Sequence, residues 1–170
     1  SQNLQLDTNV QGKAEVDAEK VLKKTWTCIR ESLDWAESTS MPVTAISFSS
    51  ASASLICLDA DMFPIRPALT YADLRASKET QWLIETYGRK AFAHTATPLH
   101  ASYWLPKLIW LKNYHLGNLE NLSFCTIKDL LIYRLTGNLV IDSSNAAALG
   151  MMDTRTMAWD KLSLDIAGIN

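Results

Sequence analysis

Residues 43–75 constrain the fold of this chain more than any other stretch. Two β-prone apolar runs, residues 43–50 and 55–59, flank a cluster of small residues at 51–54, and neither run has helical spacing. This pattern predicts two buried strands joined by a tight turn. Segments with helical periodicity precede and follow the strands, so the predicted fold class is α/β.

The end of this stretch contains the best candidate for a small-molecule site. Pro64 and Pro67 favour an extended backbone, and Tyr71, Asp73 and Arg75 follow at alternate positions. Alternate residues of an extended backbone face the same way. We therefore expect the aromatic, acidic and basic side chains to line one surface together.

Other segments have the spacing of amphipathic helices. Asp17 is placed to cap the first of them, and Thr126 with Asp129 has the spacing of a capping box. Gly137 is placed to end that helix, and Ser102 is placed to cap the one before it. The predicted helices cover residues 17–36, 78–87, 102–114, 126–137 and 160–167.

Composition argues against several classes of function. The chain has 170 residues and a formal net charge of −2, with a pI of about 5.9, which argues against a nucleic-acid-binding surface. No apolar run approaches the roughly 20 residues of a membrane helix, and the N-terminal residues do not resemble a signal peptide. Cys28, Cys57 and Cys125 are far apart, which predicts free thiols in a reducing, cytoplasmic compartment rather than a metal site.

Several short motifs occur in a definite order along nearly the whole chain. They are Gly12-x-x-Glu15-x-Asp17, the run 46–50, Tyr71-x-Asp73-x-Arg75, Lys107-x-x-Trp110-Leu111, Lys128-Asp129 followed by Tyr133-x-Leu135-Thr136-Gly137, Asp142-x-Ser144-x-Ala146, and Trp159-Asp160. In this order and spacing they resemble the FGGY family of carbohydrate kinases. Within that family, the Thr-Pro-Leu-His sequence of residues 97–100 is most similar to gluconokinases.

The resemblance implies an actin-like, ribonuclease-H-like fold with two domains and a cleft between them. Residues 1–170 would be part of the first, sugar-binding domain, without its first phosphate-binding strands and without the ATP-binding second domain. The full-length parent would use ATP and Mg²⁺ to phosphorylate a hydroxyl of a sugar, sugar acid or polyol. No Asp-x-Gly-Thr phosphate loop occurs in the sequence, so we expect this chain alone to bind neither ATP nor Mg²⁺ and to be inactive.

The resemblance also implies which residues bind substrate. By position they are Ser52, Ala53, Tyr71, Asp73, Arg75 and His100. The Tyr71 ring would stack on the sugar, and Asp73 would accept hydrogen bonds from its hydroxyls. Ala53 cannot form a side-chain hydrogen bond where the family usually has a larger polar residue. Two alternatives stay open: Arg75 pairs with Asp73 to hold the loop, and His100 is a solvated surface residue.

Two functions follow from these interpretations. The first is part of a carbohydrate kinase, with a gluconate-like substrate preferred to xylulose. The alternative is a non-catalytic sugar-binding or interaction module derived from a kinase domain, which the substituted residues at 51–54 favour. The expected partner is a small-molecule sugar or sugar acid. The resemblance allows a homodimer, and neither a nucleic acid nor a membrane is expected.

Overall fold

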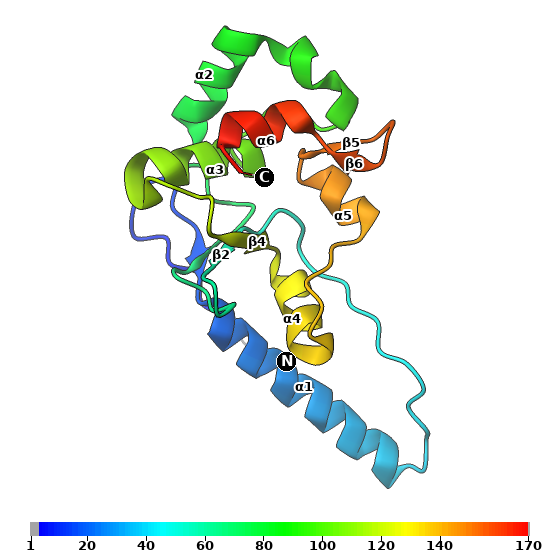
Figure 1. The fold of residues 1–170 in the computed structure, drawn as a ribbon. Helices are drawn as coiled ribbons and strands as arrows, with labels where there is room; N and C mark the ends of the chain where they lie inside the picture. The colour runs from blue at the N-terminus through cyan, green and yellow to red at the C-terminus, as the bar shows by residue number, and fades with distance from the viewer. Residues whose placement is uncertain (1–3, 170) are drawn as a thin grey trace.

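The computed structural model describes residues 4–169, in which short strands alternate with helices (Figure 1). The strands are β1 (Glu15–Val16), β2 (Ile56–Leu58), β3 (Ala68–Leu69), β4 (Ser123–Cys125), β5 (Met152–Asp153) and β6 (Ala158–Trp159). The α-helices are α1 (Ala18–Ser38), α2 (Ser77–Tyr87), α3 (Trp104–Leu111), α4 (Ile127–Thr136), α5 (Ser143–Ala148) and α6 (Lys161–Ala167). A 3-10 helix, η1 (Arg89–Thr95), follows α2, and a π-helical turn, η2 (Lys112–Leu116), follows α3. None of the helices described is long and apolar enough to cross a membrane.

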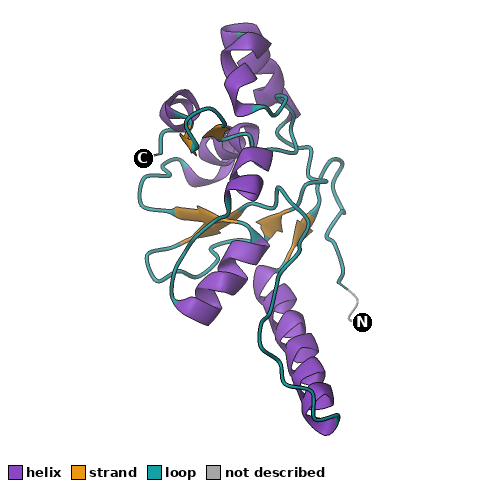
Figure 2. Cartoon of the chain, turned by 90° about the vertical axis from the view of Figure 1, so that its right-hand side faces the viewer, coloured by secondary structure: helices purple, strands orange, loops and turns teal. Residues whose placement is uncertain are grey.

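Four of the strands lie side by side in the order β1-β3-β2-β4. β1 pairs with β3 and β2 pairs with β4, both antiparallel. Leu55 precedes β2 and exchanges backbone hydrogen bonds of 2.8 and 3.0 Å with Leu69 of β3, which joins the two pairs. The strands therefore form one small sheet across the middle of the molecule (Figure 2).

Helices cover both faces of this sheet (Figure 2). Leu55 and Cys57 contact a hydrophobic core that includes residues of α2, α3 and α6, whereas Ile56 and Leu58 contact a second core that includes residues of α1 and α4. These four residues are at most 1% exposed. Because both faces of β2 are buried, its sequence is continuously apolar rather than alternating. The three layers agree with the predicted α/β class.

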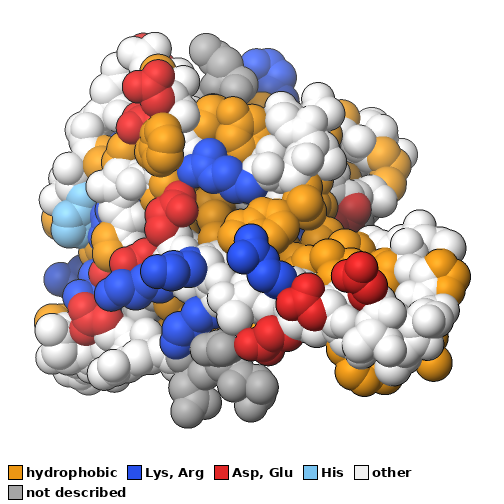
Figure 3. All heavy atoms as spheres, turned by 90° about the horizontal axis from the view of Figure 1, so that it is seen from below, with side chains coloured by type: hydrophobic (Ala, Val, Ile, Leu, Met, Phe, Trp, Pro, Cys, Tyr) orange, Lys and Arg blue, Asp and Glu red, His pale blue; other side chains and the backbone are white. Residues whose placement is uncertain are grey.

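The predicted strand over residues 43–50 is not formed. The segment is a coil in which Val43 is 50% exposed and Ile46 is 49% exposed, and it borders a groove beside α1. The backbone groups of a strand need a neighbouring strand as hydrogen-bond partner, and no strand within residues 4–169 pairs with this segment. Figure 3, which views the molecule from below, shows other hydrophobic side chains that are exposed to solvent between charged ones.

The capping residues of two helices agree with the sequence. The Asp17 side chain accepts a backbone N–H in the first turn of α1, as predicted. Thr126 and Asp129 form the predicted capping box of α4, and Gly137, with φ at 74°, ends that helix. Each of these contacts joins residues that are close in sequence, and this is why the pattern of residues was sufficient to predict them.

The three cysteines are free thiols, as predicted. Cys57 and Cys125 are buried on the paired strands β2 and β4, and Cys28 is half-buried on α1. Burial raises the pKa of the Cys57 thiol to about 12. This thiol therefore stays protonated at neutral pH and is a poor nucleophile.

Candidate functional site

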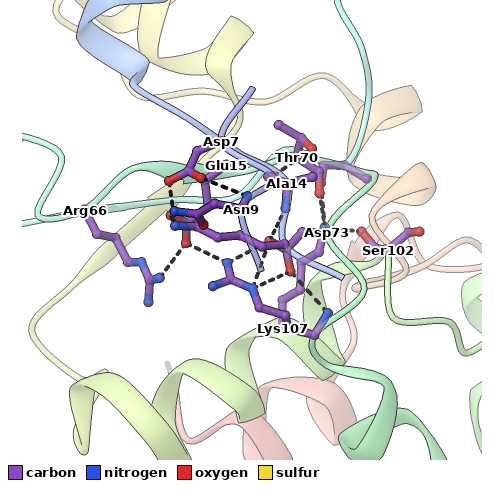
Figure 4. A network of polar contacts seen from close by, with 12 residues as sticks. Asp7, Asn9, Ala14, Glu15, Arg66, Thr70, Asp73, Ser102 and Lys107 are labelled. Atoms are coloured by element: carbon purple, nitrogen blue, oxygen red, sulfur yellow. Dashed lines mark hydrogen bonds and ion pairs between the residues drawn. The ribbon is translucent and has the colours of Figure 1, made fainter. Parts of the chain in front are cut away.

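Lys107 of α3 joins the three loops that carry the predicted site residues. Its side chain is fully buried. The ammonium group donates hydrogen bonds to the carbonyl oxygens of Ala53 at 3.3 Å, Thr70 at 2.8 Å and Ser102 at 2.5 Å. Thr70, Ser102 and Lys107 appear together in Figure 4. The three loops are named here the small-residue turn (residues 50–54), the Tyr71 loop (residues 70–75) and the His100 loop (residues 97–103).

The charge on Lys107 is maintained in a buried position. Burial lowers the pKa of its ammonium group to about 8, and the nearby Asp73 carboxylate opposes this effect. The group is therefore mostly protonated at neutral pH. A protonated lysine has three N–H donors and no acceptor, and here each donor can be matched to the carbonyl of a different loop.

The small-residue turn is fixed by further contacts with helices. Trp104 of α3 donates its indole N–H to the carbonyl oxygen of Ser54 at 2.9 Å, and the Ser54 hydroxyl accepts the N–H of Ile127 at 3.0 Å. Ala53 is buried and has a φ of 62°. That left-handed conformation costs a residue with a side chain about 1–2 kcal/mol. These contacts hold the turn in a conformation that alanine does not favour.

Ser52 provides an unused polar group in the same turn. Its hydroxyl oxygen is buried and has no hydrogen-bond partner among the described residues. Leaving a buried polar group unpaired costs about 1–3 kcal/mol. The hydroxyl could therefore be satisfied by a bound molecule with its own donor or acceptor.

The Tyr71 loop is not extended, so the predicted alignment of Tyr71, Asp73 and Arg75 on one surface is wrong. The N–H of Asp73 donates to the carbonyl oxygen of Thr70 at 3.1 Å, which bends the backbone into a turn. Tyr71 is 59% exposed, whereas Asp73 is only 1% exposed. The ring is consequently open to solvent, and the carboxylate lies inside the protein.

The Asp73 carboxylate is bound by other groups of the protein. Its Oδ2 accepts the N–H of Ala14 at 2.9 Å and Nη2 of Arg75 at 2.7 Å, and its Oδ1 accepts Nε of Arg75 at 3.1 Å. Burial alone would raise the pKa of Asp73, but these hydrogen bonds outweigh it and hold the pKa below its usual value. This geometry corresponds to the alternative role of Arg75, in which it holds the loop.

Arg75 also makes contacts outside its own loop. Its Nη2 donates to Oε1 of Glu15 at 2.6 Å, and the same carboxylate oxygen accepts Nη2 of Arg66 at 2.9 Å. The Arg75 guanidinium lies 4.5 Å from the centre of the Trp110 ring, within range of a cation–π interaction. Glu15, the acidic residue of the Gly12-x-x-Glu15-x-Asp17 motif, thus connects β1 to the Tyr71 loop.

The His100 loop carries an exposed imidazole. Nδ1 of His100 accepts the N–H of Ser102 at 3.2 Å and lies 3.0 Å from its hydroxyl oxygen. Because Nδ1 is an acceptor, the proton of the neutral ring is on Nε2. The predicted cap at Ser102 is wrong: Tyr103 precedes α3 and makes no side-chain cap, and the Ser102 hydroxyl pairs with His100 instead.

Lys107 is the central residue that the predicted site residues omit. The available signal was a lysine within the otherwise apolar helix at residues 104–111. A lysine is almost never fully buried unless its charge has partners. Its burial therefore indicated acceptors, but the sequence did not identify the loops that provide them.

The described residues do not form a site for the Mg²⁺ implied for the full-length parent. Within residues 4–169, no group of three His, Cys, Asp or Glu side chains could hold a metal ion. The acidic groups beside the site, Glu15 and Asp73, are already paired with Arg75. No step of phosphoryl transfer is therefore assigned to this chain.

Comparison with known proteins identifies one family. The sequence profile of the FGGY family of carbohydrate kinases, N-terminal domain, matches residues 1–170. The chain is 36% identical over 126 residues to a gluconokinase from Bacillus licheniformis, which covers 73% of this chain and 25% of that protein. It is 31% identical over 150 residues to a xylulose kinase from Staphylococcus xylosus, which covers 87% of this chain and 31% of that protein.

A solved structure has the same fold. The ligand-bound xylulose kinase from Lactobacillus acidophilus superposes with a TM-score of 0.90 at 29% identity, over 99% of this chain and 34% of that one. The sheet with helices on both faces is therefore part of an actin-like ATPase fold, as predicted. The chain spans from 25% to 34% of the length of these three relatives.

Proposed function

The chain belongs to the FGGY family of carbohydrate kinases, and we propose that it binds the sugar substrate within a longer ATP-dependent kinase, with gluconate preferred. The observation that carries this proposal is the convergence of three loops on the Lys107 ammonium group. These loops contain Ser52, Tyr71 and His100, which are the residues that the family resemblance implies. The gluconokinase relative supports the choice of substrate.

Three groups of these loops have the chemistry needed to bind a sugar acid. The half-exposed ring of Tyr71 offers an apolar face for the C–H groups of the sugar. The Ser52 hydroxyl and Nε2 of His100 are polar groups that can bind hydroxyls or a carboxylate. Asp73 and Arg75 bind each other, so in this proposal they position the Tyr71 loop instead of contacting the sugar.

The contribution of this chain is to bind and orient the acceptor hydroxyl. When bound, ATP with Mg²⁺ supplies the phosphoryl group and neutralises its charge. The proposal places ATP binding outside the described residues, so the chain alone is inactive. In this proposal the longer kinase is located in the cytoplasm, and it can be a homodimer.

Sugar binding is the direct test of this proposal. We expect the 170-residue chain to bind gluconate more tightly than xylulose or glycerol in calorimetric titrations. Replacement of Tyr71 by alanine should weaken gluconate binding, whereas the same change at Tyr114, which is similarly exposed at 60% against 59%, should not. If the chain binds none of these three compounds, the proposal is contradicted.

A second function, a non-catalytic sugar-binding or interaction module, is favoured by one observation. Ala53 places a buried methyl group in the small-residue turn, where the family usually provides a polar side chain. A coupled assay with gluconate, ATP and Mg²⁺ separates the two functions when it is applied to the full-length protein. Gluconate binding without phosphorylation by that protein would favour the module.

A further inference from the structure

The three loops of the candidate site come from distant parts of the chain. Lys107 lies 54 residues from Ala53, 37 from Thr70 and 5 from Ser102. Its ammonium group is nevertheless within hydrogen-bonding distance of a carbonyl on each loop. One buried atom is therefore bonded to all three segments that carry the proposed sugar contacts.

We propose that Lys107 is a positioning residue of the sugar site, because its ammonium group fixes the spacing between the small-residue turn, the Tyr71 loop and the His100 loop. The role in sugar binding rests on the proposed function, whereas the fixing of the loops does not. Lys107 itself is buried behind the loops and acts through their backbones.

The chemistry of the ammonium group suits this role. Its three N–H donors point in tetrahedral directions, so one group can serve three carbonyls that converge from different sides. The carbonyl oxygens are bonded by a charged donor, which makes each hydrogen bond stronger than one between neutral groups. Arginine would be larger and planar, and methionine has no donor.

Two of the loops also have bonds that do not involve Lys107. The small-residue turn has the bonds of Ser54 with Trp104 and Ile127, and the Tyr71 loop has the bonds of Asp73 with Arg75 and Ala14. We therefore expect loss of the ammonium group to loosen the loops without unfolding them.

The first experiment replaces Lys107 by methionine in the whole chain, which keeps most of the side-chain length and removes the donors. The control is Lys112→Met on the adjoining η2, because the Lys112 ammonium lies 3.4 Å from the carbonyl oxygen of Ala167, away from the three loops. Amide hydrogen exchange is measured along all three proteins. We expect roughly tenfold faster exchange in the three loops of Lys107→Met, with α1 and α4 unchanged. The control should match the wild type in the loops.

The same samples are titrated with gluconate. We expect roughly tenfold weaker binding by Lys107→Met and wild-type binding by Lys112→Met. Unchanged exchange in the loops, or an equal increase throughout the chain, would overturn the positioning role. Loosened loops with unchanged gluconate affinity would overturn it as well. If the wild-type chain binds none of gluconate, xylulose and glycerol, the proposed function fails, and the exchange data still decide whether Lys107 fixes the loops.

A pH series keeps the proposal testable if Lys107→Met does not fold. The charged group that acts on Lys107 is Asp73, which is paired with Arg75. The other titratable side chains on the three loops are Tyr71, His100 and Tyr103. Burial lowers the pKa of Lys107 to about 8, so the wild type loses this charge between about pH 7 and pH 9.5. Loop exchange relative to α4 should increase over this range in both the wild type and Lys112→Met. A constant ratio would overturn the proposal.

Discussion

Arg75 donates from two nitrogen atoms to the carboxylate of Asp73, with Nη2 at 2.7 Å and Nε at 3.1 Å from Oδ2. The side chain of Asp73 is 2% exposed and that of Arg75 is 16% exposed. Asp153 and Arg155 repeat the Asp-x-Arg spacing and pairing, but there the aspartate side chain is 14% exposed and the arginine side chain is 70% exposed. The chain thus contains two ion pairs of the same spacing, one buried and one open to solvent at its arginine.

Replacement of Asp73 by asparagine should destabilise the protein. The change removes the charge that binds Arg75 and an acceptor of the Ala14 N–H, and hydrogen bonds to charged groups contribute roughly 1.5–3 kcal/mol each. We expect a loss of that order in the free energy of unfolding, measured with urea. The matched control is Asp153→Asn, which should have a smaller effect because its partner Arg155 is 70% exposed and water screens the pair. Equal losses in both variants would contradict the importance of burial.

Acidic pH should weaken the same network. The pKa values of Asp73 and Glu15 lie below their ordinary values of 3.8 and 4.5 in the folded chain, so the folded state binds fewer protons than the unfolded state. Their contribution to stability is complete above the ordinary values and is lost as the pH falls through the lower, folded-state values. The difference in unfolding free energy between the wild type and Asp73→Asn should therefore shrink from about pH 6 to about pH 3. A difference that does not change with pH would argue against this prediction.

Replacement of Tyr71 by alanine should separate binding from stability. The ring is 59% exposed, so its loss should change the unfolding free energy little. Stacking by an aromatic ring contributes about 0.5–1.5 kcal/mol, which corresponds to roughly twofold to tenfold in gluconate affinity. Calorimetric titration of gluconate and thermal unfolding of the same samples test both parts. A large loss of stability with unchanged affinity would give Tyr71 a structural role instead.

The backbone conformation of Ala53 predicts that its replacement by glycine changes the unfolding free energy unusually little. Its φ of 62° is unfavourable for alanine and acceptable for glycine, so relief of this strain should offset the loss of a buried methyl group in Ala53→Gly. We expect a change in unfolding free energy of less than about 1 kcal/mol. Ala68 of β3 is the control, because it is 0% exposed and is not among the residues with positive φ. Ala68→Gly should cost about 1–2 kcal/mol, and urea unfolding that ranks the two variants in reverse would refute the argument.

The sequence by itself determined the features that depend on neighbouring residues and on motif order. Asp17, Thr126 with Asp129, and Gly137 define helix ends because each acts within about one helical turn of its own position. The apolar run that becomes β2 was predicted as a buried strand. The order of the motifs was sufficient to identify the family, which the profile match over residues 1–170 confirms.

Only the tertiary structure decided the features that depend on remote partners. Residues 43–50 have a β-prone sequence but no strand partner within the described chain, so they are a coil. Asp73 turns inward because the N–H of Ala14, 59 residues away, is one of its donors. Lys107 is central because three carbonyls from separate loops meet at its ammonium group. A hydrogen bond between distant residues depends on how the whole chain packs, and the spacing of residues along the sequence does not contain that information.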